Sequence, residues 1–162
     1  MPRFVSDMVQ VHVCREFGDG SYEHLLLRRS MGEIPYPGIW QVVTGMIEPS
    51  ETAIEAAARE LYEETGIRTD EFIVVPLVSS FFDPVADTVH FVPVFASIVP
   101  PGTPVRLSPE HQAIAWLSAS EAAARLPIPL HRQALHILEE TVLPAPHNHV
   151  FQRVRSPLSI GE

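Results

Sequence analysis

The segment from Thr52 to Gly66 constrains the fold most tightly, because it predicts one helix with defined ends and a crowd of acidic side chains. Thr52 and Glu55, three residues apart, match a capping box at the start of a helix, and Gly66 is a natural C-terminal cap. A helix over 53–65 would be about 20 Å long at the standard rise per residue. One side of it is apolar and requires burial. That stripe consists of Ile54, Ala57, Ala58 and Leu61.

Three carboxylates gather on one side of the predicted helix. At about 100° per residue, Glu60, Glu63 and Glu64 fall within an arc of roughly 100°. Like charges at this spacing repel each other, and the chain already carries a net charge of −9. A solvated face is the simplest explanation, but carboxylates this close favour a bound cation. Because hard oxygen ligands select Mg²⁺, Mn²⁺ or Ca²⁺, the pattern predicts a divalent metal site on this helix.

Composition and charge narrow the classes of partner. The net charge of −9 argues against a nucleic acid polymer or an anionic membrane as the partner, since both favour basic surfaces. Cys14 is the only cysteine, so neither an intrachain disulfide nor a cysteine-rich zinc site is expected. The N-terminal residues lack the apolar core of a signal peptide, which leads us to expect a cytoplasmic protein.

Several segments with the period or composition of strands surround the helix. We expect strands in "MVQVHVC", "HLLLRR", "IWQVVTG", "FIVVPLVSSFF" and "VHFVPVFASIV", with "AIAWL" as a short last strand. Ser118 and Glu121 match a second capping box, and an amphipathic helix is expected over 130–140. The intermixed elements predict an α/β (α+β) domain over 1–143. The proline-containing segment 144–162 has no clear period and is expected to be a loosely ordered tail.

The run "GMIEPSETAIEAAARELYEETGI", residues 45–67, resembles the Nudix box. That pattern is Gly, five residues, Glu, seven residues, and then Arg-Glu-aliphatic-any-Glu-Glu-any-Gly-aliphatic. Every specified position matches, namely Gly45, Glu51, Arg59, Glu60, Leu61, Glu63, Glu64, Gly66 and Ile67. The resemblance implies the Nudix fold, a mixed β-sheet sandwiched between α-helices. It also implies a hydrolase whose substrate is a small molecule with a phosphoanhydride bond and whose cofactor is Mg²⁺, with Mn²⁺ as an alternative.

The resemblance also implies roles for individual box residues. The ligands of the divalent metal would be Glu60, Glu63, Glu64 and the backbone carbonyl of Gly45. Glu51 and Arg59 would form a pair whose role is chiefly structural. The general base comes either from the box helix, where Glu63 is the candidate, or from a loop, and the sequence leaves this choice open.

Three further phrases resemble the dihydroneopterin triphosphate and deoxynucleoside triphosphate pyrophosphatases of the Nudix family. They are "WQVVTG" before the box, "EHQAIAWL" and "HRQAL". Under this resemblance Glu110 would serve as a catalytic residue and a metal ligand. Arg28 and Thr44 would contact the substrate, Arg28 as a fork for phosphate oxygens.

Several alternatives stay open at this point. The favoured activity is cleavage of a nucleoside- or pterin-type triphosphate to the monophosphate and pyrophosphate. The second is hydrolysis of ADP-ribose or another nucleoside-diphosphate-linked compound, and the third is a non-catalytic ligand sensor. The sequence leaves the number of metals and the oligomeric state undetermined, with a homodimer as one alternative. Phe81 and Phe82 fit either a base pocket or the core, and His111 is expected only to flank Glu110.

Overall fold

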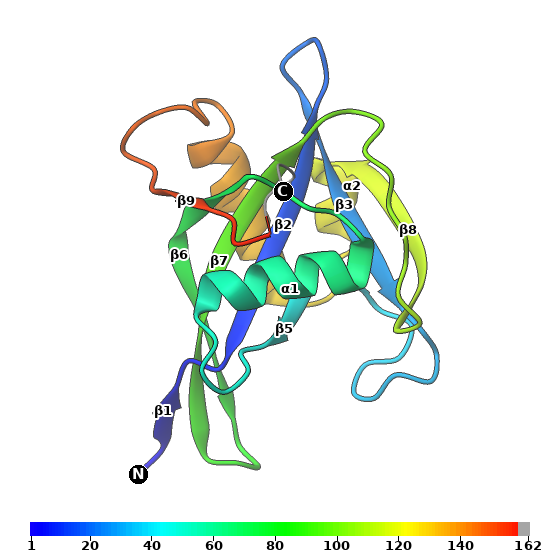
Figure 1. Cartoon of the computed structure of the whole chain (residues 1–162). Coiled ribbons are helices and arrows are strands. Elements are labelled where there is room, and N and C mark those ends of the chain that lie inside the picture. Colours follow the sequence, from blue (N-terminus) through cyan, green and yellow to red (C-terminus); the bar gives the residue numbers. More distant parts are fainter. Residues whose placement is uncertain (159–162) are drawn as a thin grey trace.

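The computed structural model describes residues 1–158 as a mixed sheet with helices on both faces (Figure 1). Its strands are β1 (Arg3–Val5), β2 (Met8–Glu16), β3 (Tyr22–Arg29), β4 (Trp40–Gln41), β5 (Val43–Met46), β6 (Glu71–Asp83), β7 (Thr88–Val99), β8 (His111–Ser118) and β9 (Arg153–Arg155). Its helical segments are α1 (Ala53–Thr65), α2 (Ala119–Arg125), α3 (Pro129–Ile137) and the π-helical turn η1 (Leu138–Val142). This architecture confirms the expected α/β (α+β) fold class.

The sheet has the strand order β4-β3-β2-β7-β6-β9, while β1 pairs with β7, β5 with β2, and β8 with β3. Strand β7 runs parallel to β2 and to β1, and the other pairs are antiparallel. Two hairpins are present, because β2 pairs with β3 and β6 pairs with β7. The register of the β6–β7 pair shifts between Val74 and Val78, so Pro76 lies at an irregular point where its missing N–H costs no ladder bond.

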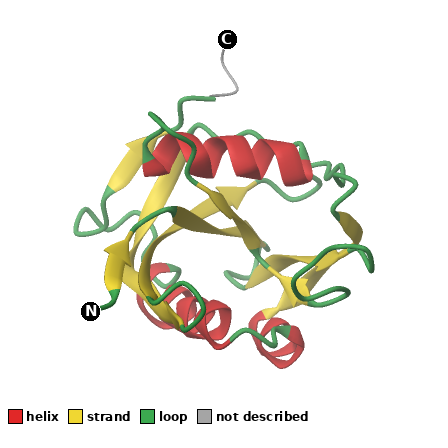
Figure 2. Cartoon of the chain, turned by 90° about the horizontal axis from the view of Figure 1, so that it is seen from below, coloured by secondary structure: helices red, strands yellow, loops and turns green. Residues whose placement is uncertain are grey.

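Alternation along β2 distributes its side chains between two cores. Val9, Val11 and Val13 lie in the cluster that packs against α1, where Leu61 is also buried. Cys14 points to the other face and packs with residues of α3 and η1. The view in Figure 2 shows α1 on one side of the strands and the other helices on the opposite side. Alternate residues of β2 therefore point to opposite faces of the sheet, and both faces are buried.

Both predicted capping boxes are present. The Thr52 side chain accepts from the Glu55 N–H, and Gly66 ends α1 in the left-handed region at φ 71°. The Ser118 side chain accepts from the Glu121 N–H at the start of α2. Local sequence therefore determines these helix ends, because each cap is completed within four residues.

The C-terminal third differs from expectation in three ways. The strand at "AIAWL" is longer, covering all of β8, and it is not the last, because β9 follows it. The helix expected over 130–140 is α-helical only to Ile137 and continues as the π-helical η1.

No helix within 1–158 is long and apolar enough to cross a membrane.

The segment expected to be a loose tail is partly ordered. Strand β9 pairs antiparallel with β6, and the Ser156 N–H donates to the Asp70 carbonyl at 2.8 Å. Phe151 and Leu158 pack against the two main cores. Periodicity could not reveal β9, because three residues are too few and their pairing partner is about eighty residues earlier in the chain. The part of the expected tail at 159–162 lies outside the described residues.

Three histidines are buried between the sheet and α3. His12 Nε2 lies 2.8 Å from Gln10 Nε2, and His24 Nε2 lies 2.6 Å from Glu139 Oε1. His131 Nδ1 is buried without a hydrogen-bond partner. Burial lowers the pKa of His131 to about 4, and the pKa of His12 is also lowered by burial and by the neighbouring imidazoles. The rings of His12 and His131 are therefore neutral in the folded protein at pH 7.

This burial predicts a loss of stability in mild acid. The unfolded chain takes up a proton on His131 near pH 6.5, whereas the folded chain does so only near pH 4. Stability is therefore complete above pH 6.5 and falls as the pH decreases toward 4, by about 3 kcal/mol for this group. Urea denaturation at pH 7 and pH 4.5 measures the effect. The free energy of unfolding should decrease less between these two pH values in His131→Phe than in the parent. His149→Gln, a change at an exposed histidine, serves as the control. If the free energy of unfolding depended on pH in His131→Phe as it does in the parent, His131 would not be the source of this dependence.

Candidate active site on the box helix

The acidic side of α1 lies against β5, where glycine is required at position 45. A Cβ added to Gly45 would lie 1.9 Å from Cδ and 2.0 Å from Oε1 of Glu60. No side chain can share that space, so Gly45 lets the Glu60 carboxylate lie directly on the strand. Helix and strand thus bring together two residues that the sequence places fifteen positions apart.

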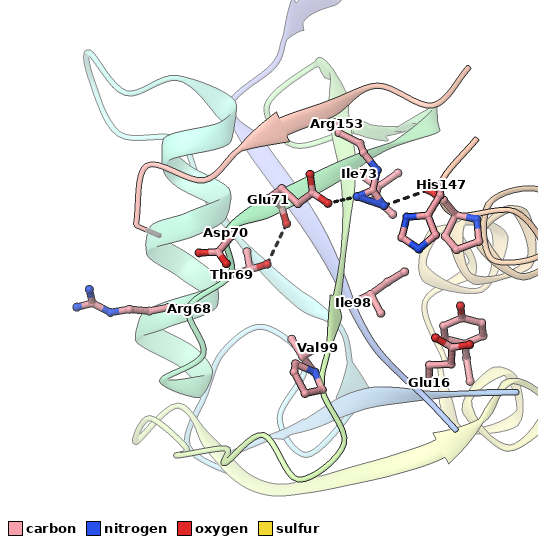
Figure 3. Close-up of a pocket in the computed structure, with 13 residues that line it drawn as sticks. Glu16, Arg68, Thr69, Asp70, Glu71, Ile73, Ile98, Val99, His147 and Arg153 are labelled. Carbon is pink, nitrogen blue, oxygen red and sulfur yellow. Dashed lines mark hydrogen bonds and ion pairs between the residues drawn. The ribbon is translucent and has the colours of Figure 1, made fainter. Parts of the chain in front are cut away.

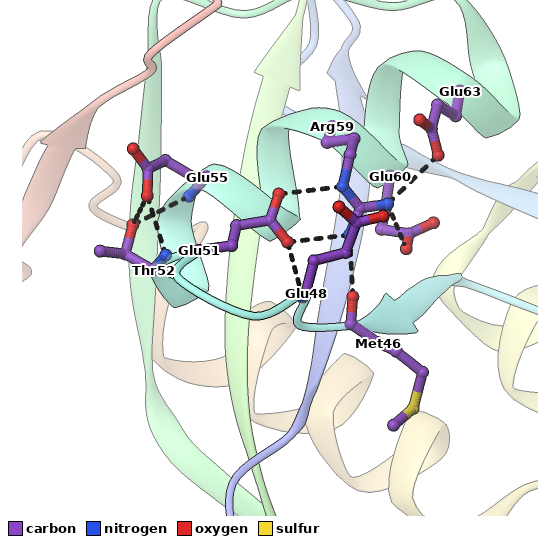
Figure 4. A network of polar contacts seen from close by, with 8 residues as sticks. All are labelled: Met46, Glu48, Glu51, Thr52, Glu55, Arg59, Glu60 and Glu63. Carbon is purple, nitrogen blue, oxygen red and sulfur yellow. Dashed lines mark hydrogen bonds and ion pairs between the residues drawn. The ribbon is translucent and has the colours of Figure 1, made fainter.

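Arg59 is the centre of a polar network that ties the box loop to the helix (Figure 4). Its Nε and Nη2 donate to the two carboxylate oxygens of Glu51, each at 2.9 Å, and Nη2 also donates to the Met46 carbonyl at 2.8 Å. The expected Glu51–Arg59 contact is therefore present as a two-bond fork. Arg59 Nη1 additionally donates to Glu60 at 2.7 Å and to Glu63 at 3.2 Å, which the sequence did not suggest.

Glu64 is the buried carboxylate of the group, with a side chain only 6% exposed. Its Oε2 has no hydrogen-bond partner within the described residues. Burial raises its pKa well above the usual value, the charges of Glu60 and Glu110 add to that rise, and the Arg29 charge and the Thr44 backbone N–H oppose it. A buried anionic oxygen without a partner is costly, so the ionised form of Glu64 requires a cation.

Glu110 lies in the loop immediately before β8 and its side chain is exposed. Its charge acts on both Glu60 and Glu64, raising the pKa of each, which places the three carboxylates in one neighbourhood. The Glu110 carbonyl accepts from the Ser30 N–H at 2.8 Å, so the loop after β3 holds this loop in place. Glu63 is different, because its side chain is 57% exposed and Arg59 binds it.

The two neighbouring arginines of β3 have separate surroundings. Arg28 is exposed and its Nε donates to the Gly38 carbonyl at 3.1 Å, which ties it to the loop after β3. Arg29 instead acts electrostatically on Glu64 and His111, and its Nε is buried without a partner. Arg29 was missed by the sequence reasoning. The doubled arginine was the available signal, but the register shift between Arg28 and Arg29 cannot be read from sequence.

The carboxylate oxygens of this region are the kind of ligand that a divalent metal such as Mg²⁺ binds. Glu64 offers an unpartnered oxygen, and the glycine at position 45 leaves room for Glu60. As the side chains stand, no three His, Cys, Asp or Glu residues among 1–158 are grouped closely enough to hold an ion. Arg59 accounts for part of this, because it occupies oxygens of Glu60 and Glu63. Metal binding therefore requires these contacts to open.

Two phenylalanines considered from the sequence, and a histidine of the C-terminal segment, have surroundings of their own. Phe81 and Phe82 are exposed and so do not belong to the core, and Phe81 stacks on His90 with ring centroids 4.6 Å apart. His147 lines a separate cavity of about 360 Å³ at the ends of β6 and β7, where Arg153 pairs with Glu71 (Figure 3). None of the box carboxylates lines that cavity.

Comparison with protein families gives one match that covers most of the chain. A model described as the NUDIX domain matches residues 8–147. The bis(5'-nucleosyl)-tetraphosphatase [asymmetrical] of Rattus norvegicus is 33% identical over 113 residues, covering 68% of this chain and 74% of that protein. The CTP pyrophosphohydrolase of Escherichia coli is 32% identical over 115 residues, covering 71% of this chain and 79% of that protein.

One relative is longer than the others. An octanoyltransferase of Myxococcus xanthus is 39% identical over 117 residues, which cover 68% of this chain and only 30% of that protein. The shared region is thus a minor part of the octanoyltransferase, and its name says little about this chain.

Solved structures agree with the fold. The MutT protein of Methanosarcina mazei is 27% identical with a TM-score of 0.68, covering 85% of this chain and 94% of that chain. The dihydroneopterin triphosphate pyrophosphohydrolase of E. coli is 26% identical with a TM-score of 0.67, covering 85% and 98%. An Ap4A hydrolase of C. elegans, at 24% identity, TM-score 0.69 and coverage of 83% and 96%, supports the fold alone.

Proposed function

The chain belongs to the Nudix family of phosphoanhydride hydrolases, and from this premise we propose that it cleaves a nucleoside- or pterin-type triphosphate to the monophosphate and pyrophosphate. The observation that carries the proposal is Glu64, a buried carboxylate with an unpartnered oxygen beside Glu60 and Glu110. Such a group favours a divalent cation, and a triphosphate brings negative charge that only cations can balance in a chain of net charge −9.

Each residue has a proposed role in this reaction. Glu60 and Glu64 would hold Mg²⁺ or Mn²⁺ with the Gly45 carbonyl, and Glu63 and Glu110 would complete the site at its exposed side. The metal, when bound, lowers the pKa of water and neutralises phosphate oxygens. Arg28 and Thr44 would contact the substrate.

Glu110 is the stronger candidate for the general base. Within residues 1–158 no hydrogen bond or ion pair occupies its carboxylate, whereas Arg59 binds Glu63. A base must contact the attacking water, and the Glu110 carboxylate can do so without first leaving an ion pair, as Glu63 would have to.

Glu110→Gln should therefore lower kcat by a factor of roughly 10² or more, because the amide cannot accept the proton. Steady-state rates at saturating Mg²⁺ measure the effect, and Glu140→Gln, an exposed change on the helical segment η1, is the matched control. A reduction of less than about threefold would place Glu110 among the surface residues and return Glu63 as the candidate.

A substrate panel tests the proposed function. Dihydroneopterin triphosphate and dATP should be hydrolysed with higher kcat/KM than ADP-ribose, and the products should be monophosphate and pyrophosphate. Chelation should abolish turnover. Release of orthophosphate alone from the triphosphate would contradict the proposed cleavage position. No turnover of any compound with Mg²⁺ or Mn²⁺ would leave the ligand-sensor alternative.

A dinucleoside tetraphosphate is the second candidate substrate. The relative from R. norvegicus, which acts on such compounds by its name, is as similar to this chain as the CTP pyrophosphohydrolase is. The same panel should include this substrate. A kcat/KM well above those for all triphosphates, with two unequal nucleotide products, would favour it.

A further inference from the structure

We propose that His111, held by Gln41, is a positioning residue that orients Glu64 for metal binding. The proposal rests on the proposed function, because it assigns Glu64 to the metal. His111 was expected only to flank Glu110, yet the two adjacent side chains have opposite environments. The Glu110 side chain is exposed, whereas the His111 side chain is 0% exposed and faces Glu64.

The imidazole of His111 has a polar neighbour at each of its two ring nitrogens. Its Nε2 lies 3.2 Å from Gln41 Nε2 and 3.8 Å from Glu64 Oε2, and its Nδ1 lies 3.4 Å from Ser108 Oγ. The His111 N–H also donates to the Ser108 carbonyl at 3.1 Å. Ser108 in turn donates its N–H to the Glu64 carbonyl at 3.3 Å, so α1 and the start of β8 are joined at this point.

The oxygen that faces this ring is the one without a partner. Glu64 Oε2 has no hydrogen bond, and at 3.8 Å the His111 Nε2 is just beyond hydrogen-bond range. If Ser108 Oγ–H donates to Nδ1, the ring proton is on Nε2 and points toward Glu64 and the Gln41 amide. Oxygen and nitrogen of an amide are assigned from such networks, so Gln41 presents its oxygen in this arrangement.

The chemistry of the site explains why an imidazole, rather than a guanidinium, is useful there. A cationic partner at this place would compete with a metal for the same carboxylate, as Arg59 does for Glu60 and Glu63. An imidazole N–H that points at this oxygen favours one rotamer of the carboxylate and leaves its charge to the metal. The buried amide of Gln41 contacts the same ring nitrogen, Nε2, and Ser108 Oγ lies at the other nitrogen, so the ring is held at both ends.

The test compares metal affinity and kinetics in matched variants. His111→Leu removes the donor, and His111→Gln replaces it with an amide N–H at a similar reach. Mn²⁺ binding by calorimetry without substrate should weaken by roughly tenfold or more in His111→Leu and recover largely in His111→Gln. The Mg²⁺ concentration for half-maximal rate should change in parallel, while KM for the substrate at saturating metal changes much less.

Two controls separate positioning from folding. His131→Phe alters a buried histidine on the other face of the sheet, and its Mn²⁺ affinity should equal that of the parent. Gln41→Leu should weaken Mn²⁺ binding in the same direction as His111→Leu, which keeps the proposal testable if His111→Leu fails to fold. Parent-like Mn²⁺ affinity in both His111→Leu and Gln41→Leu overturns the proposal. Because Mn²⁺ binding is measured without substrate, an error in the proposed substrate does not affect this result.

Discussion

Glu64→Gln should lose turnover by a factor on the order of 10² or more while the protein stays folded. The amide keeps the size of the side chain but removes the charge that a divalent metal requires. The carboxylate is buried and one oxygen is unpartnered, so no neighbouring group can replace it. Steady-state kinetics and melting temperature, with and without Mg²⁺, measure the two effects. Near-normal activity at millimolar Mg²⁺ would remove Glu64 from the metal site.

The same variant should show that the buried charge of Glu64 destabilises the folded protein when no metal is bound. The pKa of Glu64 is raised in the folded protein, so the folded state holds this proton more tightly than the unfolded chain. That contribution to stability is present in acid and is lost as the pH rises through the folded pKa. In chelator, Glu64→Gln should therefore gain melting temperature relative to the parent between pH 5 and pH 8. With Mg²⁺ the parent should gain and the variant should not, because the ion stabilises only the folded cluster that binds it.

Gly45→Ala should impair metal binding and turnover more than it impairs the fold. The new Cβ would lie within 2.3 Å of three atoms of the Glu60 side chain, so the carboxylate must leave the strand. The displaced group is a side chain rather than backbone, and the stability loss should therefore be small. We expect kcat to fall by roughly 10² at fixed Mg²⁺.

Gly18→Ala is the matched control for this substitution. It adds the same methyl group where no atom lies within 4 Å, and its activity should equal that of the parent. Parent-like Mg²⁺ dependence in Gly45→Ala would show that Glu60 does not need its place on β5. Unfolding of Gly45→Ala would instead indicate a structural requirement, which the melting temperature distinguishes.

The sequence by itself determined the box helix and much of the sheet. Caps at Thr52 and Gly66 are completed within a few residues, so local chemistry sets the ends of α1. The residue pattern predicted strands at β2 and β3, and these two strands pair directly. The spacing of Glu60, Glu63 and Glu64 places them within one arc of the helix. These features depend on contacts close in sequence, where residue pattern and structure correspond directly.

Only the tertiary structure decided which polar groups surround the carboxylates. Arg29, at the point where the β3–β8 register shifts, acts electrostatically on Glu64. Strand β8 brings His111 to the same side chain while Glu110 stays exposed. Strand β9 exists because its backbone pairs with the distant edge of β6. Each of these outcomes depends on a strand register or on a pairing across many residues. Periodicity in one segment carries no information about its partner, and this is why the sequence left them undetermined.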